Sequence, residues 1–96
     1  MIRVVDLSVI PNQEVTFNIN GEQWLLRLFT AGSVLCCDVY LNDDVVVLGA
    51  RVVPAEPIIR YSAGEYGGNF YIVTEQDEYP HWKSLGGKHL MVYSDD

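Results

Sequence analysis

Residues 14–29, with the sequence EVTFNINGEQWLLRLF, decide the fold class. In the first half of this stretch Val15, Phe17 and Ile19 alternate with polar residues, which is the pattern of a strand with one buried face. The pair Asn20-Gly21 follows, and both residue types tolerate the positive φ angles of a type I′ turn. The extended pattern then resumes to the end of the stretch. These residues therefore predict a β-hairpin.

Further strand-like segments follow, rich in β-branched and aromatic residues and separated by turn residues. After the hairpin, strands are expected at Val34–Leu41, Val45–Val53, Ile58–Tyr61, Asn69–Thr74 and His89–Tyr93. Pro54 and Pro57 lack the N–H that a ladder needs, so the segment between them is expected to form a corner or a crossing.

Helical periodicity is absent from the sequence, apart from room for one turn around His81–Leu85. The sequence therefore predicts an all-β fold of six to seven short antiparallel strands, as a small barrel or as a sandwich. The segment Met1–Asn12 either pairs as a further strand or wraps a partner.

Size and charge restrict the function. A chain of 96 residues is expected to form a single all-β domain over 1–96, because it can build only one modest core. The net charge of −7 and the total of six lysines and arginines argue against nucleic acid as a partner. Apolar runs are of strand length only, and the first ten residues lack the features of a signal peptide, so we expect no membrane partner and synthesis in the cytosol.

The residues that could carry chemistry do not form a recognisable motif. His81 and His89 are two potential ligands where a structural zinc site needs four, so both are expected on loop surfaces. The acidic cluster Glu75, Asp77 and Glu78 lacks the spacing of a calcium loop and is expected to be a solvated loop.

The adjacent Cys36 and Cys37 point to opposite faces of a strand, which disfavours a disulfide between them, and at least one is expected to be packed in the core. The run Gly64–Gly68 lacks the ending of a phosphate-binding loop and is expected to be a plain loop. The sequence thus predicts no enzyme activity, no cofactor and no metal.

One segment suggests a contact surface. Tyr79, Pro80 and Trp82 lie close together in a stretch that is expected to be irregular and exposed, and aromatic residues are enriched in protein interfaces. Alternatively, Trp82 folds back and caps one end of the strand assembly.

The order of these features resembles a known family over most of the chain, from Val15 to Tyr93. The resemblance rests on the first hairpin, a turn at Gly32, a second pair of apolar strands up to Val53, and the C-terminal segments. The motifs are Val15–Gly21, Trp24–Leu28, Gly68–Val73, Tyr79-Pro80, Leu85-Gly86 and Leu90–Tyr93. In this layout the chain resembles the baseplate plug proteins of contractile-tailed bacteriophages.

The resemblance implies a virion structural protein of the tail baseplate, placed near the central tube, in a phage or prophage. It implies contacts with other tail and baseplate proteins, with a homo-oligomeric ring as one arrangement, and it implies no catalytic residues. The short link from Phe29 to Ser33 departs from the family pattern and also fits a different tail component on the same fold. The alternative function is a soluble bacterial β-barrel module that binds a peptide or a small ligand.

Overall fold

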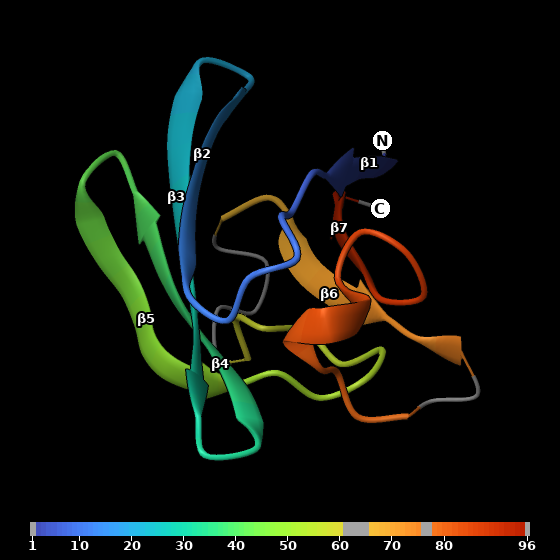
Figure 1. Ribbon diagram of the computed structural model, residues 1–96. Helices are drawn as coiled ribbons and strands as arrows, with labels where there is room; N and C mark the ends of the chain where they lie inside the picture. Colours follow the sequence, from blue (N-terminus) through green and yellow to red (C-terminus); the bar gives the residue numbers. More distant parts are fainter. Residues whose placement is uncertain (1, 61–65, 76–77, 96) are drawn as a thin grey trace.

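The computed structural model describes residues 2–60, 66–75 and 78–95, and within them seven strands form two antiparallel sheets. Figure 1 shows the sheets side by side, with the core between them. The larger sheet has the order β2 (Gln13–Ile19), β3 (Glu22–Ala31), β4 (Val34–Leu41) and β5 (Asp44–Arg51). The smaller sheet has the order β1 (Ile2–Val5), β7 (Leu90–Ser94) and β6 (Asn69–Val73). The all-β prediction is confirmed, and the two separate sheets form a sandwich.

Consecutive hairpins build the four-stranded sheet. At the β2–β3 turn Asn20 has φ of 53° and Gly21 has φ of 81°, as a type I′ turn requires. Ile19 therefore pairs with Glu22, and the register continues to the end of β2. The hairpin predicted from the sequence is confirmed.

The three-stranded sheet brings together segments that are far apart in the sequence. Ile2–Val5 forms β1 and pairs with β7, with Val4 opposite Val92. On its other side β7 pairs with β6, where Tyr71 is opposite the same Val92. The N-terminal segment thus begins with a paired strand.

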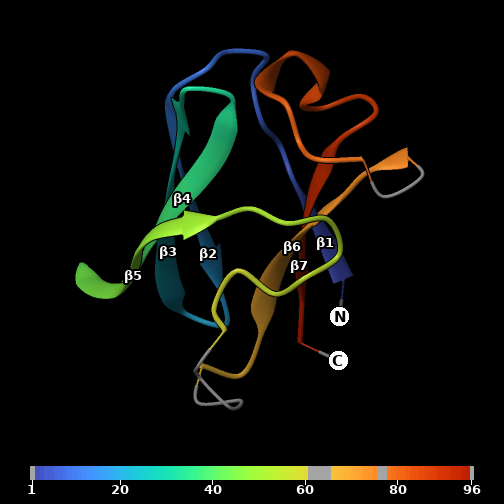
Figure 2. The same cartoon turned by 90° about the horizontal axis from the view of Figure 1, so that it is seen from below.

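The connection from β5 to β6 runs from the larger sheet to the smaller one (Figure 2) and corrects one prediction. Ile58, Ile59 and Arg60 do not form a strand, while Tyr61 lies outside the described residues. The Asn69 side chain accepts from the N–H of Ile59 at 2.9 Å and donates to its carbonyl at 2.7 Å. A side chain therefore occupies the backbone groups that a neighbouring strand would use.

The same connection still borders β6. The N–H of Ala55 donates to Ile72 O and that of Ile58 donates to Phe70 O, both at 2.9 Å. Pro54, which precedes Ala55, forms an isolated bridge with Ile72. The connection covers the edge of β6 without extending the sheet as a regular strand.

An aromatic cluster joins the two sheets. The ring of Phe70 on β6 lies 5.5 Å from Phe17, 5.1 Å from Trp24 and 5.3 Å from Tyr93, measured between centroids. Phe17 and Trp24 belong to the larger sheet and Tyr93 to the smaller one. Edge-to-face and tilted ring pairs of this kind add about 0.5–1.5 kcal/mol each beyond the burial of their area.

Candidate interaction surfaces

The loop between β6 and β7 carries the aromatic residues that the sequence suggested as a contact surface. A 3-10 helix, η2, spans Trp82–Ser84, within the segment where the sequence allowed one helical turn. Tyr79 is 62% exposed, and the guanidinium of Arg51 lies over its ring, 5.0 Å from the centroid. Pro80 is buried, whereas Trp82 is half-buried against the core. The loop therefore exposes most of Tyr79 and part of Trp82, whereas the expected exposure of Pro80 is wrong.

A buried histidine holds this loop. His89 is only 2% exposed, so its predicted place on a loop surface is wrong, whereas His81 is exposed as predicted. The N–H of His81 donates to His89 Nδ1 at 3.0 Å, and His89 Nε2 lies 3.0 Å from Glu78 Oε1. Because Nδ1 accepts a hydrogen bond, the ring proton belongs on Nε2, which donates to the Glu78 carboxylate. A neutral imidazole thus fixes both ends of the segment that carries Tyr79.

The alternation of the last strand contained the signal for this burial. Met91 and Tyr93 face the core, and His89 precedes Met91 by two residues, which places it on the same face. The acidic cluster was predicted to be solvated, and Glu75 and Glu78 are exposed as predicted. Asp77 lies outside the described residues. In the part of the chain that the structure describes, no three histidine, cysteine or acidic residues gather as metal ligands.

The prediction for the cysteines is confirmed. Cys37 is fully buried on the inner face of β4, and Cys36 is half-buried on the outer face. Both are free thiols. Residues 64 and 65 of the predicted glycine loop lie outside the described residues.

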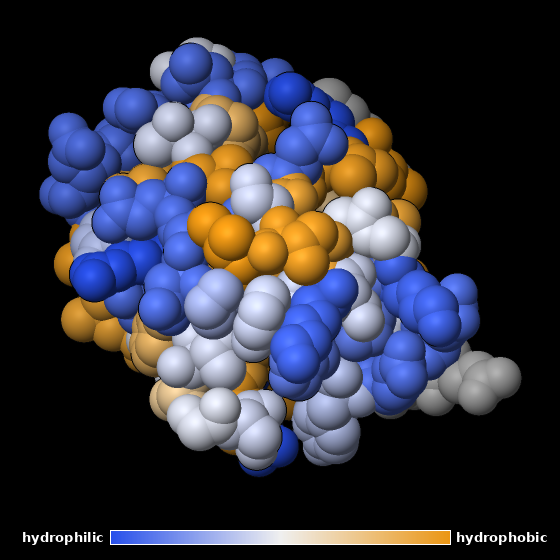
Figure 3. Space-filling view, viewed as in Figure 1, coloured by the Kyte–Doolittle hydropathy of each residue, from blue (hydrophilic) through white to orange (hydrophobic). Residues whose placement is uncertain are grey.

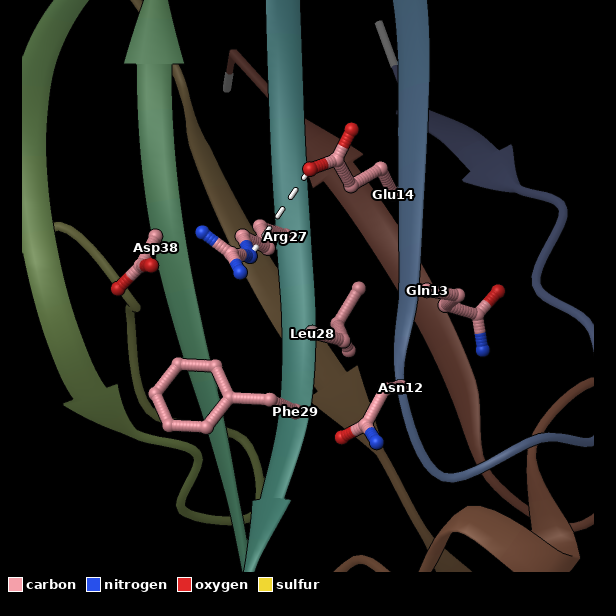
Figure 4. A pocket seen from close by; sticks show the side chains of 7 residues that line it. All are labelled: Asn12, Gln13, Glu14, Arg27, Leu28, Phe29 and Asp38. Atoms are coloured by element: carbon pink, nitrogen blue, oxygen red, sulfur yellow. Dashed lines mark ion pairs between the residues drawn. The ribbon is translucent and has the colours of Figure 1, made fainter.

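A shallow hollow of about 630 Å³ lies on the four-stranded sheet (Figure 4). Its lining residues are Asn12, Gln13, Glu14, Arg27, Leu28, Phe29 and Asp38. Arg27 lies between Glu14 on β2 and Asp38 on β4, and its Nε is 3.9 Å from Glu14 Oε1. Both side chains of the ion pair are more than half exposed, and such pairs contribute only about 0–1 kcal/mol. The hollow is an open, charged surface.

A second hollow, of about 190 Å³, separates β1 from β2. We call it the seam groove, and it is lined by Arg3, Val4, Val5, Asp6, Val15, Thr16, Phe17, Ile19 and Tyr93. Sequence reasoning missed it, because the groove exists only where two separate sheets meet. The approach of these sheets depends on core packing and not on a local pattern.

Exposed apolar side chains gather near the N-terminal part of the chain. Ile2 and Val4 on β1 are 66% and 58% exposed, and Val9 and Ile10 in the following connection are 55% and 45% exposed. Figure 3 shows apolar surface over this connection. Apolar surface of this kind on a small protein commonly marks a contact with another molecule.

These features define a class of protein: a small all-β sandwich with exposed aromatic and apolar side chains. The family model described as cyanophage baseplate Pam3 plug gp18 matches residues 2–96. The chain belongs to this family of baseplate plug proteins, and the resemblance seen in the sequence is confirmed. A comparison with curated proteins finds no match. Within the described ranges, no helix has the length and apolar character needed to cross a membrane.

Proposed function

We propose that this protein is a structural subunit of the phage tail baseplate, placed near the central tube, and that it acts through contacts with other tail and baseplate proteins. The observation that carries the proposal is the match of the plug family to residues 2–96. The match also supports the view that the whole chain works as one domain. Such a protein is made in the host cytoplasm and becomes part of the virion during assembly.

The loop that His89 holds is one contact surface in this proposal. Tyr79 is 62% exposed and Trp82 is half-buried, while the burial of Pro80 suits a role in positioning its neighbours. Interface hot spots are enriched in tyrosine and tryptophan, and a preformed loop loses little conformational entropy on binding. Tyr79 is therefore the side chain of this loop that contributes most to assembly.

Charge supports protein partners over other classes. The net charge of −7 disfavours binding to nucleic acid and to anionic membrane surfaces. Copies of the chain repel one another for the same reason, so a ring of copies needs basic neighbours or close apolar contacts between subunits. A catalytic role has no support from the family, which is a structural one.

Purified phage particles test the proposal directly. Mass spectrometry and immunogold labelling should detect the protein at the tail tip in a fixed copy number. Tyr79→Ala should reduce its incorporation about 30-fold, since truncation of a hot spot costs about 2 kcal/mol or more. The control is Leu48→Ala, which removes a side chain of similar exposure (59%) from β5 and should leave incorporation unchanged. Absence of the wild-type protein from intact particles would refute the baseplate assignment.

A further inference from the structure

Both sheets end at the seam groove. β1 is the edge strand of the smaller sheet and β2 is the edge strand of the larger one, and residues of both line the groove. Arg3 crosses it, with Nη1 donating to Asn18 O at 3.2 Å. A side chain here satisfies a backbone group that a further strand would otherwise satisfy.

The hydrogen-bond pattern shows which groups of β2 face the groove. The N–H of Asn42 donates to Gln23 O at 2.8 Å, which places Gln23 among the β3 residues that bond toward β4. Because these directions alternate along a strand, Trp24 and Leu26 bond toward β2. Their register partners are Phe17 and Val15.

The residues between those partners therefore direct their backbone groups away from β3. They are Glu14, Thr16 and Asn18, all with exposed side chains. The contact from Arg3 to Asn18 O agrees with this assignment. A row of outward N–H and C=O groups at alternate residues is a template on which another extended chain can pair.

The floor of the groove is apolar and incompletely covered. Val15 and Phe17 face the core from β2, yet both are only half-buried. Their neighbours on β3, Leu26 and Trp24, are 0% and 1% exposed. The inner face of the larger sheet is thus incompletely covered at Val15 and Phe17, where an additional strand would supply the cover.

Two residues of opposite charge line the groove. Arg3 and Asp6 both line it and both are exposed. Asp6 follows Arg3 by three positions, which corresponds to about 10 Å of extended chain. An occupant with an acidic side chain near Arg3 and a basic one near Asp6 would complement both.

We propose that the seam groove binds an extended segment of another baseplate protein, which adds as a strand to the free edge of β2. The segment places apolar side chains on Val15 and Phe17, an acidic side chain at Arg3 and a basic one at Asp6. Arg3 releases Asn18 O, and the backbone of the added strand takes its place. This inference rests on the proposed baseplate function, and the net charge of −7 favours a different protein over a second copy as the occupant. Strand addition of this kind derives affinity from main-chain hydrogen bonds and specificity from alternate side chains.

Photo-cross-linking in intact particles tests the geometry of the added strand. A cross-linking amino acid is placed at Glu14, Thr16 or Asn18 of the full chain, and at Val45 as the control. Val45 lies next to the β4–β5 turn, where Leu41 pairs with Asp44, so its backbone groups face the other open edge of the sheet. The three positions on the edge of β2 should label one segment of one partner, in steps of about two residues from each position to the next. Scattered labelling, or labelling of a second copy of the chain, would overturn the proposal.

A pair of proline variants tests whether incorporation into particles needs the free edge of β2. Thr16→Pro removes an N–H that faces the groove and leaves the bonds from β2 to β3 in place, as proline on a strand edge does. Val45→Pro makes the same change at the opposite edge. Incorporation into particles should fall at least about tenfold for Thr16→Pro, which corresponds to about 1.4 kcal/mol, and should not change for Val45→Pro.

The outcomes separate the two proposals. Equal incorporation of both proline variants, beside a wild-type protein that is present, would overturn strand addition and leave the baseplate function standing. Absence of the wild-type protein would overturn both. Thermal unfolding of each variant checks its fold. If Thr16→Pro does not fold, the cross-linking series tests strand addition by itself.

Discussion

The two sheets of this protein are built in different ways. The larger sheet contains four strands in unbroken chain order, each joined to the next by a two-residue turn. The smaller sheet combines the N-terminal strand with two strands from the last third of the chain. The first sheet needs only local pairing, whereas the second forms only if the core holds its strands together. The molecule therefore depends on its aromatic cluster for the smaller sheet more than for the larger one.

The largest expected effect comes from Phe70→Ala, which removes the ring shared by both sheets. Phe70 is fully buried and contacts rings from β2, β3 and β7. The free energy of unfolding should fall by about 3–5 kcal/mol, as is typical of phenylalanine truncation in a core. Urea unfolding measures it, with the fluorescence of Trp24 reporting on the larger sheet in a Trp82→Phe background and circular dichroism on both sheets.

Phe29→Ala is the matched control, since Phe29 is half-buried on the outer face of the larger sheet. Phe29→Ala should lower the free energy of unfolding by clearly less than Phe70→Ala does. Coincident transitions from both probes would show that the sheets unfold together. Two separate transitions in the wild-type protein would instead show that the sheets unfold independently. This result would contradict the dependence of the smaller sheet on the shared aromatic cluster.

The difference between the sheets also explains what the sequence could predict. The turn at Asn20-Gly21 and the alternation around it depend on neighbouring residues alone, so the hairpin and its buried face were predictable. The 58–60 segment contains apolar residues typical of a strand, but the side chain of Asn69, about ten residues away, bonds to Ile59 instead. Long-range competition of this kind leaves no trace in a local pattern.

The candidate surfaces divide in the same way. Tyr79 and Trp82 were found because aromatic residues stand out in a polar loop. The burial of His89 and the seam groove depend on how distant segments pack, so local reasoning missed both. Continuing the alternation of β7 back to His89 was the one sequence signal that could have revealed its burial.

A smaller effect is expected at Gly68, just before β6. A Cβ at this position would overlap the ring of Tyr93, which is buried on β7 and cannot move away easily. Gly68→Ala should lower the free energy of unfolding by about 1–3 kcal/mol, as overpacking does. The nearest atom is the Tyr93 hydroxyl oxygen, so a Tyr93→Phe background should reduce this cost.

Gly21→Ala provides the contrast in the larger sheet. A Cβ at Gly21 would meet no atom within 4 Å, but the residue has φ of 81°. Its cost of about 1–2 kcal/mol should come from backbone strain alone and should not change in the Tyr93→Phe background. Equal rescue of both variants by Tyr93→Phe would contradict the assignment of the Gly68 effect to a contact between strands of the smaller sheet.

The smallest effect concerns Cys36 and Cys37, which lie on opposite faces of β4. Burial, together with the charge of Asp38 and the neighbouring Cys36, raises the pKa of the Cys37 thiol from 9.0 to about 12. The unfolded chain releases this proton near pH 9 while the folded protein retains it, so the associated stability is present below pH 9 and is lost as pH rises toward 12. Between pH 9 and pH 10 the loss should be about 1 kcal/mol.

Urea unfolding at several pH values between 8 and 10 measures this loss. Cys37→Ala should lower stability at every pH, through the cavity it creates, but should flatten the decline above pH 9. Cys36→Ala should keep the decline, and iodoacetamide at pH 8 should label Cys36 well before Cys37.

If the decline in stability above pH 9 persists in Cys37→Ala, another group titrates in this range. Tyr93 could account for it only nearer pH 10, since burial raises its pKa above 10.0, with Asp95 and Glu22 adding to the shift. The smaller sheet, and not the centre of the larger one, would then set the alkaline limit of the fold.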